Sequence, residues 1–249
     1  MTNFETVSPE KHNQIRIDES KLISQFSTSH LVNIEIGEAI QAAGEYPLFF
    51  SKVSNANQWA LSALCGLAPG ENVFEIKQSW QALYTPLSLK TLPFTLQFET
   101  VEQEPTVLID THSPAVSHSE GEALYLSTNR PTAYFDNKKK LLKERVSAMS
   151  QTASILNEIA ELGLIQPVDL VIEFSDNTQQ RVGGLATLNE HRIQALTAEE
   201  LNTLNQKNVL SVVFNILGSI FQVNRLIRFH NTKFPDRSVS NIKFETSKS

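Results

Sequence analysis

The chain has 249 residues, of which 41% are hydrophobic, so it can bury a substantial core as one large domain or two small ones. Its 27 acidic and 21 basic side chains give a formal net charge of −6, which argues against nucleic acid as the main partner. Cys65 is the single cysteine, which excludes an intramolecular disulfide, and its place in an apolar run is typical of a small buried hydrophobe. The N-terminus shows no basic segment followed by an apolar run, so we expect no Sec-type signal peptide and a cytoplasmic location.

Proline positions divide the chain into regions of different secondary structure. Five of the ten prolines fall in the range 86–131, whereas the stretches 132–166 and 168–234 contain none. Because proline is excluded from helix interiors, the N-terminal part should consist of short strands and turns, and the proline-free stretches should hold the long helices. Before residue 111, strands are predicted at 31–36, 48–53, 95–99 and 106–110, and a short helix at 37–44.

The clearest helix is predicted from about residue 137 to residue 162. Asp136 is a suitable N-cap, Gly163 is a suitable terminator, and the lysine run 138–140 is typical of a solvated helix face. Six residues spaced three or four apart are predicted to form the apolar face: Leu142, Val146, Met149, Ala153, Leu156 and Ala160.

A hairpin is predicted after this helix. Its strands, 168–174 and 179–185, flank a turn at Asp176-Asn177. In the first strand, apolar and more polar residues alternate, so one face should be buried and the other mostly polar. The pair Gly183-Gly184 near the end of the second strand indicates a bulge or a close packing contact.

Two further helices are predicted near the C-terminus. Thr197-x-x-Glu200 matches a capping box that opens a short helix ending near residue 206. The segment 209–227 is mostly apolar and long enough to cross a bilayer, but polar residues recur in it every three or four positions. This pattern favours an amphipathic helix packed on a soluble domain over a transmembrane segment, with a partner-helix or membrane-surface role as the alternative. The polar stripe consists of Ser211, Asn215, Ser219, Gln222 and Arg225.

The end of the chain is polar and basic. From Arg225 onward there are six basic and two acidic side chains, a net charge of +4 against −10 for the rest of the chain. We therefore expect a single domain over residues 1–230 and a loosely held tail over residues 231–249. Strands first and helices later indicate an α+β fold, in which a β-rich N-terminal part of short strands and turns precedes a long helix, a hairpin and C-terminal helices.

One group of residues resembles a metal site. Two imidazoles and a carboxylate can hold iron with open coordination positions, and Asp110, His112 and His118 supply these groups. The serines around them are typical of an exposed polar loop, which is the favoured interpretation. The sequence contains no GxSxG, P-loop or GxGxxG pattern, and we expect no cofactor.

The segment 59–94 concentrates rigid residues. It holds both tryptophans, interleaved with prolines and glycines that fix how the backbone turns. Aromatic residues next to prolines are common where a loop packs on a sheet, so core or turn packing is the first interpretation. The alternative is a recognition surface, with the candidate partner-binding residues Trp80, Tyr84, Pro86 and Phe94.

Short motifs follow one another in a fixed order along nearly the whole chain. They include Glu38, Ala42-Ala43, Tyr46-Pro47-Leu48-Phe49-Phe50, Leu64-x-Gly66-Leu67, Trp80, Tyr84-x-Pro86, Pro93-Phe94, Gly121-Glu122-Ala123-Leu124, Gly184-Leu185 and Asn189-Glu190. Each piece is unspecific, but the collinear series resembles the SapC family of bacterial proteins, which the chain also matches in length.

The resemblance implies a role linked to surface-layer systems or to uptake through TonB-dependent receptors, and it supplies no catalytic residues. The leading hypothesis is a SapC-like accessory or binding protein, cytoplasmic or envelope-associated, whose aromatic, proline-containing segment engages a peptide or protein partner. One alternative is a metal-dependent, oxygenase-like enzyme that uses Asp110, His112 and His118. The other is a structural component of a surface layer.

Overall fold

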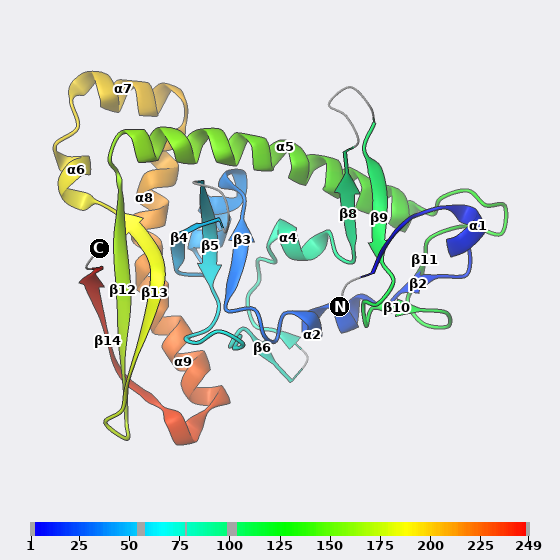
Figure 1. Ribbon diagram of the computed structural model, residues 1–249, viewed down its shortest axis with the longest axis horizontal. Helices are drawn as coiled ribbons and strands as arrows, with labels where there is room; N and C mark the ends of the chain where they lie inside the picture. Colours follow the sequence, from blue (N-terminus) through cyan, green and yellow to red (C-terminus); the bar gives the residue numbers. More distant parts are fainter. Residues whose placement is uncertain (1–2, 54–57, 78, 99–103, 248–249) are drawn as a thin grey trace.

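Six antiparallel strands form the main sheet, in the order β14-β12-β13-β4-β5-β3 (Figure 1). The computed structural model describes residues 3–53, 58–77, 79–98 and 104–247. In chain order the strands of this sheet are β3 (Leu31–Ile34), β4 (Leu48–Lys52), β5 (Trp59–Leu64), β12 (Ile165–Phe174), β13 (Gln179–Leu188) and β14 (Val239–Thr246). The chain is thus a mixed α+β protein, as predicted.

The predicted hairpin is β12–β13, and each of its strands is three residues longer than expected. Gly184 has a positive φ of 77°, and the register of the hairpin shifts between Val168 and Leu170. The glycine pair therefore lies at a bulge, which confirms the interpretation of Gly183-Gly184.

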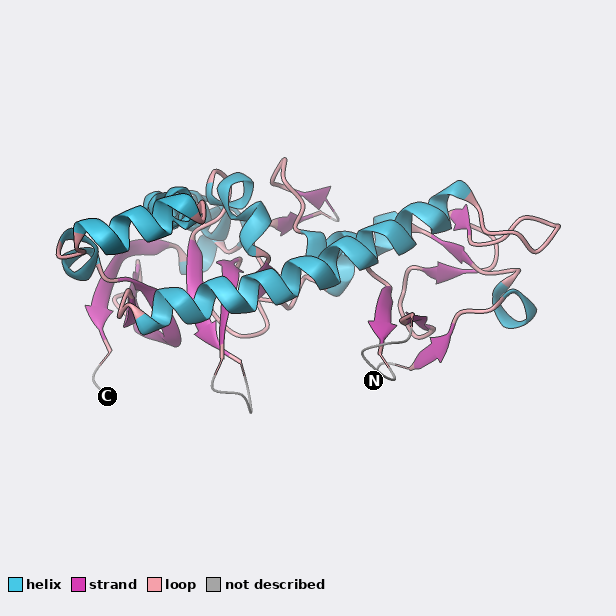
Figure 2. Ribbon diagram, turned by 90° about the horizontal axis from the view of Figure 1, so that it is seen from above, coloured by secondary structure: helices cyan, strands magenta, loops and turns pink. Residues whose placement is uncertain are grey.

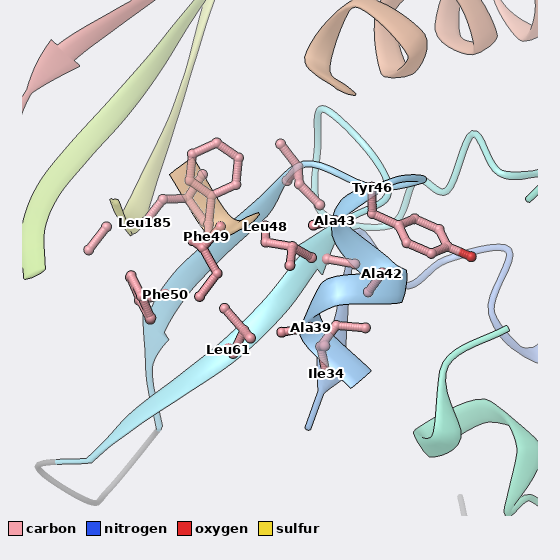
Figure 3. Packing of buried hydrophobic residues seen from close by; sticks show 14 of the residues in the cluster. Ile34, Ala39, Ala42, Ala43, Tyr46, Leu48, Phe49, Phe50, Leu61 and Leu185 are labelled. Atoms are coloured by element: carbon pink, nitrogen blue, oxygen red, sulfur yellow. The ribbon is translucent and has the colours of Figure 1, made fainter. Parts of the chain in front are cut away.

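Helices pack on the main sheet, and their apolar side chains form a hydrophobic core together with those of the strands. Figure 3 shows the small side chains Ala39, Ala42 and Ala43 of α3 beside strand residues Leu48 and Leu61. These helical elements are η2 (Ile36–Glu38), α3 (Ala39–Ala43), α6 (Glu190–Gln194), α7 (Ala198–Gln206), α8 (Val209–Ser219), η3 (Ile220–Gln222) and α9 (Val223–Lys233). Among the described residues, 38 buried hydrophobic ones form this cluster, which we call the main core.

The predicted capping box is present at the start of α7. The Glu200 amide donates to Thr197 Oγ1 over 3.2 Å, and the Thr197 amide donates to Glu200 Oε2 over 2.7 Å. Cys65 is fully buried in the main core, and burial raises the pKa of its thiol, as expected of a structural cysteine.

A second, smaller region surrounds the N-terminal segment. It contains two three-stranded sheets, with the orders β1-β9-β8 and β10-β2-β11. Its strands and helices are β1 (Phe4–Thr6), α1 (Pro9–His12), β2 (Arg16–Ile17), η1 (Glu19–Lys21), α2 (Leu22–Gln25), β8 (Phe94–Gln97), β9 (Thr106–Asp110), β10 (Val116–Ser117) and β11 (Glu122–Ala123). Its ten buried hydrophobic residues form the N-terminal core: Ile15, Ile17, Leu22, Phe94, Ile109, Ala115, Leu124, Tyr125, Phe135 and Leu142.

Helix α5 (Ala133–Glu161) joins the two regions and runs along the length of the molecule (Figure 2). Its first half contributes Phe135 and Leu142 to the N-terminal core, and its second half contributes Leu156 and Ile159 to the main core. The small β-ribbon β6 (Glu75–Ile76) with β7 (Ser79–Trp80) and the short helix α4 (Leu87–Lys90) belong to the main region. Leu89 is buried in the main core, and Trp80 packs against it.

Three details of the prediction for this helix are wrong. The N-cap is Thr132, whose Oγ1 accepts from the Phe135 amide over 3.3 Å, so the helix begins before Asp136. Met149 is 49% exposed because the helix packs through its two ends and not along one continuous face. Lys138 is 5% exposed and not solvated, because it lies against α4. Gly163, with φ of 69°, ends the helix as predicted.

The predicted loose tail is also wrong for most of its length. β14 forms the edge of the main sheet and pairs with β12 from Val168 to Phe174. Val239 is buried in the main core, and Asn231 binds both backbone groups of Val239 through its side-chain amide. The many polar residues of this segment belong to an edge strand, which exposes most of its surface to water.

The helical segment Val209–Lys233 is long and apolar enough to cross a membrane by length and composition alone. In the structure one face of this segment packs on the main core, with Val209, Val213 and Ile216 fully buried. Ser219 does not belong to a solvated stripe: it is buried, and its Oγ accepts from the Leu48 amide over 3.0 Å.

Candidate functional site

A cleft lies where the N-terminal core meets the main core, below the N-terminal half of α5. It encloses a cavity of about 470 Å³ whose lining comes from both regions. Figure 1 shows α2 and α4, which supply two of its walls, near each other below α5. The apolar lining consists of Leu22, Ile23, Phe26, Trp80 and Leu89, and the charged lining of Glu19, Lys90 and Lys138. We call this cavity the cleft.

An ion pair forms the floor of the cleft. The Lys138 Nζ lies 2.6 Å from Glu19 Oε1 and donates to the Lys90 carbonyl oxygen over 2.6 Å. Tyr134 donates its hydroxyl proton to the same carboxylate oxygen over 2.9 Å, and its phenol pKa is raised by burial and by the Glu19 charge. Helix α5 is thereby tied to both α4 and the N-terminal segment.

Trp80 is half-buried and forms one wall of the cleft. Its indole Nε1 donates to the Tyr46 hydroxyl over 2.7 Å, and its ring stacks on Phe74 with centroids 6.0 Å apart. The Tyr46 hydroxyl in turn donates to the Tyr84 carbonyl oxygen. The orientation of the indole is therefore fixed before any ligand arrives.

Tyr84 fixes the segment that leads from Trp80 into α4. Its hydroxyl donates to Glu38 Oε2 over 2.5 Å, and the Leu87 amide donates to the same oxygen over 2.9 Å. Burial and the Glu38 carboxylate raise the pKa of the Tyr84 phenol, so its hydroxyl stays protonated and donates to Glu38 even well above neutral pH. Glu38 Oε1 accepts from the Glu35 amide over 2.9 Å, which completes a capping box at η2.

Behind Glu38 lies a second buried carboxylate. Glu35 Oε2 accepts from Thr152 Oγ1 over 2.8 Å, and burial raises the pKa of the Glu35 carboxyl. The guanidinium of Arg145 lowers this pKa in part and donates to Thr91 Oγ1 over 3.0 Å. These groups, together with Glu38, link η2 and α5 to the wall of the cleft.

The structure separates the four candidate partner-binding residues. Trp80 lies on the wall of the cleft, and Tyr84 lies beside it with the Lys90 Nζ 4.8 Å from its ring centroid. Phe94 is 1% exposed and packs on Phe135 in the N-terminal core, with ring centroids 5.5 Å apart. Pro86 is buried as the N-cap residue of α4. Phe94 and Pro86 therefore hold the fold and offer no surface to a partner.

Asp110, the carboxylate of the candidate metal group, binds two backbone amides. Asp110 Oδ1 accepts from the Asn3 amide over 2.9 Å and from the His112 amide over 3.1 Å. Within the described ranges, no group of three or more histidine, cysteine, aspartate or glutamate side chains could hold a metal ion. Asp110, His112 and His118 are not brought together as ligands.

A larger cavity, of about 630 Å³, lies between α5 and α7. It is lined by glutamates and small polar residues, and Lys207 pairs with Glu158 across it over 2.8 Å. Because it lacks the aromatic wall that ligand sites generally offer, the cleft at Trp80 is the better candidate site.

Sequence reasoning identified Trp80, Tyr84 and, through the family motifs, Glu38, but it missed Glu19, Glu35, Lys138 and Arg145. Glu35 and Glu38 stand three residues apart after a strand, which is the spacing of a capping box, so this signal was present. Glu19 and Lys138 are far apart in sequence, and no local pattern connects them.

Comparison with curated proteins found no match, and comparison with solved structures found none either. The SapC family matches residues 7–226, which include every residue of the cleft. Since this match spans most of the sequence, the chain belongs to the SapC family.

Proposed function

We propose that the chain is an accessory protein that binds a peptide segment of a partner protein in the cleft. The observation that carries the proposal is the position of Trp80, a half-buried aromatic side chain on the wall of a cavity that lies between two cores. Aromatic anchors in pockets dominate binding energy at protein interfaces, and ligand sites favour junctions between structural units.

The rigidity of the wall supports the proposal. The Trp80 indole, the Tyr84 hydroxyl and the Leu87 amide each have a hydrogen-bond acceptor inside the protein. A ligand that enters the cleft does not have to order this segment, so less of its binding energy is lost to conformational entropy.

A cavity-filling substitution tests the proposal without removing any packing contact. Thr85 lines the cleft, and a tyrosine at this position would fill it. Thr128 is exposed in the loop before α5, so Thr128→Tyr is the matched control. A phage-displayed random peptide library would be panned on the wild-type protein.

We expect the enriched peptides to bind Thr85→Tyr at least about tenfold more weakly and to bind Thr128→Tyr unchanged, because one lost anchor contact costs about 1.4 kcal/mol or more. Thermal melts of both variants verify that they are folded. Equal binding to both variants, or a library that yields no binder, contradicts the proposal.

The family resemblance suggests a cellular context for this proposal. We propose that the partner belongs to the cell envelope, in surface-layer or TonB-linked uptake functions, and that the chain meets it from the cytoplasmic side. Affinity capture from the native host with the wild type and Thr85→Tyr in parallel tests this. We expect the wild type to capture envelope proteins that Thr85→Tyr does not capture. If the proteins captured by the wild type alone are cytosolic, the envelope assignment is wrong.

A further inference from the structure

We infer that the cleft recognises the C-terminal residue of a peptide, with its carboxylate at Lys90 and its apolar side chain against Trp80. This inference rests on the proposed function and names the ligand chemistry of the same site.

The lining carries two cations and one carboxylate. Glu19 and Lys138 neutralise each other at 2.6 Å. Lys90 forms no ion pair with any residue in the described part of the chain, and its Nζ lies over the ring of Tyr84. A solvent-exposed cation–π contact is weak, so a ligand anion can compete for the ammonium group.

The Lys90 backbone is held by hydrogen bonds, whereas its side chain extends from this fixed position. Its carbonyl oxygen accepts from Lys138 over 2.6 Å, and its amide donates to the Pro86 carbonyl oxygen over 3.1 Å. The side chain is exposed. The cleft therefore presents one uncompensated positive charge from a fixed backbone position.

Apart from Ser20 and Thr85, the rest of the lining is apolar. Phe26, Trp80 and Leu89 lie on the same cavity as Lys90, so a ligand must bring an apolar group close to its negative charge. The last residue of a peptide has this arrangement when it is leucine, isoleucine or phenylalanine. A small alkyl carboxylate also combines a negative charge with an apolar group. It lacks the peptide backbone of the ligand that the proposed function requires.

The test uses acetylated tetrapeptides that end in leucine, phenylalanine, alanine or lysine, each made as the free acid and as the amide. A fifth peptide carries an aspartate followed by a leucine amide, and hexanoate is included as a small acid. Trp59→Phe leaves Trp80 as the single tryptophan, so its fluorescence reports on the cleft. Binding is then compared between Trp59→Phe alone and Trp59→Phe combined with either Lys90→Gln or Lys140→Gln. Lys140 is an exposed lysine of α5, so Lys140→Gln removes the same charge at a position outside the cleft.

We expect the acids ending in leucine or phenylalanine to bind at least tenfold more tightly than their amides. This preference should disappear in Lys90→Gln and persist in Lys140→Gln. Equal binding of acids and amides, or tight binding of the aspartate-containing amide, would overturn the C-terminal assignment while leaving the proposed function intact. If hexanoate bound as tightly as the best peptide, the inference that the ligand is a peptide would be wrong. If neither these peptides nor the random library bind, both proposals fail.

Discussion

The N-terminal core and the main core differ in size and in what supports them. In the part of the chain that the structure describes, the first contains ten buried hydrophobic residues and is built largely from two- to five-residue strands, whereas the second contains 38 and includes strands of ten residues. A cluster of ten side chains is smaller than the core that an independent domain generally needs. We infer that the N-terminal region depends on α5, and that the cleft exists because a small core is held against a large one by this shared helix.

The largest effect is expected from removing β14. Deletion of residues 239–249 exposes the edge of β12 and removes Val239 from the main core. We expect the melting temperature to fall by about 10 °C or more, or the protein to aggregate, because several kcal/mol of burial and pairing are lost. Circular-dichroism melts test this. A cooperative melt at the full-length temperature would show that the strand contributes nothing.

Two leucines on α5 test the dependence of one region on the other. Leu142 lies in the N-terminal core and Leu156 in the main core, both at most 2% exposed. Each change to alanine should lower the free energy of unfolding by about 2–5 kcal/mol. If α5 couples the regions, both variants unfold in a single transition by tryptophan fluorescence and by circular dichroism. A separate early transition in Leu142→Ala alone would mean that the regions are independent.

A smaller effect is expected at the floor of the cleft. Lys138→Met removes a buried ammonium group that ties Glu19 to the Lys90 carbonyl oxygen. Because Glu19 is half-exposed and can be solvated, we expect a loss of about 1–3 kcal/mol, below the range for a fully buried pair. Lys140→Met is the control on the same helix and should change stability by at most about 0.5 kcal/mol. Equal urea midpoints for the two variants would refute the structural role of the ion pair.

The smallest effect concerns the pH dependence of stability at Glu35. Burial raises its pKa in the folded state, so its contribution to stability is full below the unfolded pKa and is lost as pH rises through the folded pKa. In Glu35→Gln the side chain cannot ionise, so this variant does not lose that contribution to stability as pH rises. From about pH 4 to about pH 7, the wild type should therefore lose stability relative to Glu35→Gln in urea titrations. Glu144→Gln, an exposed control on α5, should run parallel to the wild type, and a parallel profile for Glu35→Gln would contradict the prediction.

Local signals in the sequence predicted most of the elements. The hairpin, the capping box at Thr197 and the end of α5 at Gly163 depend on neighbouring residues, and all three were predicted correctly. The strand character of residues 239–246 was missed because an edge strand buries few side chains and so shows little apolar alternation.

The candidate site was predicted only in part, since it depends on contacts between distant segments. Trp80 stood out by its residue type, but nothing near Phe94 in sequence distinguishes a core aromatic from an exposed one. Lys138 appeared solvated because it belongs to a lysine run. Its burial arises from the packing of α4 and η1 on α5, which no local pattern encodes.

Hydrogen–deuterium exchange of the full-length protein with a peptide selected on it tests the central claim most directly. If the cleft between the two cores is the binding site, amides in residues 19–26, 80–90 and 134–141 should exchange more slowly with peptide bound, so that protection appears in both regions at once. Protection confined to residues 154–162 and 199–207, which line the cavity between α5 and α7, would contradict the account.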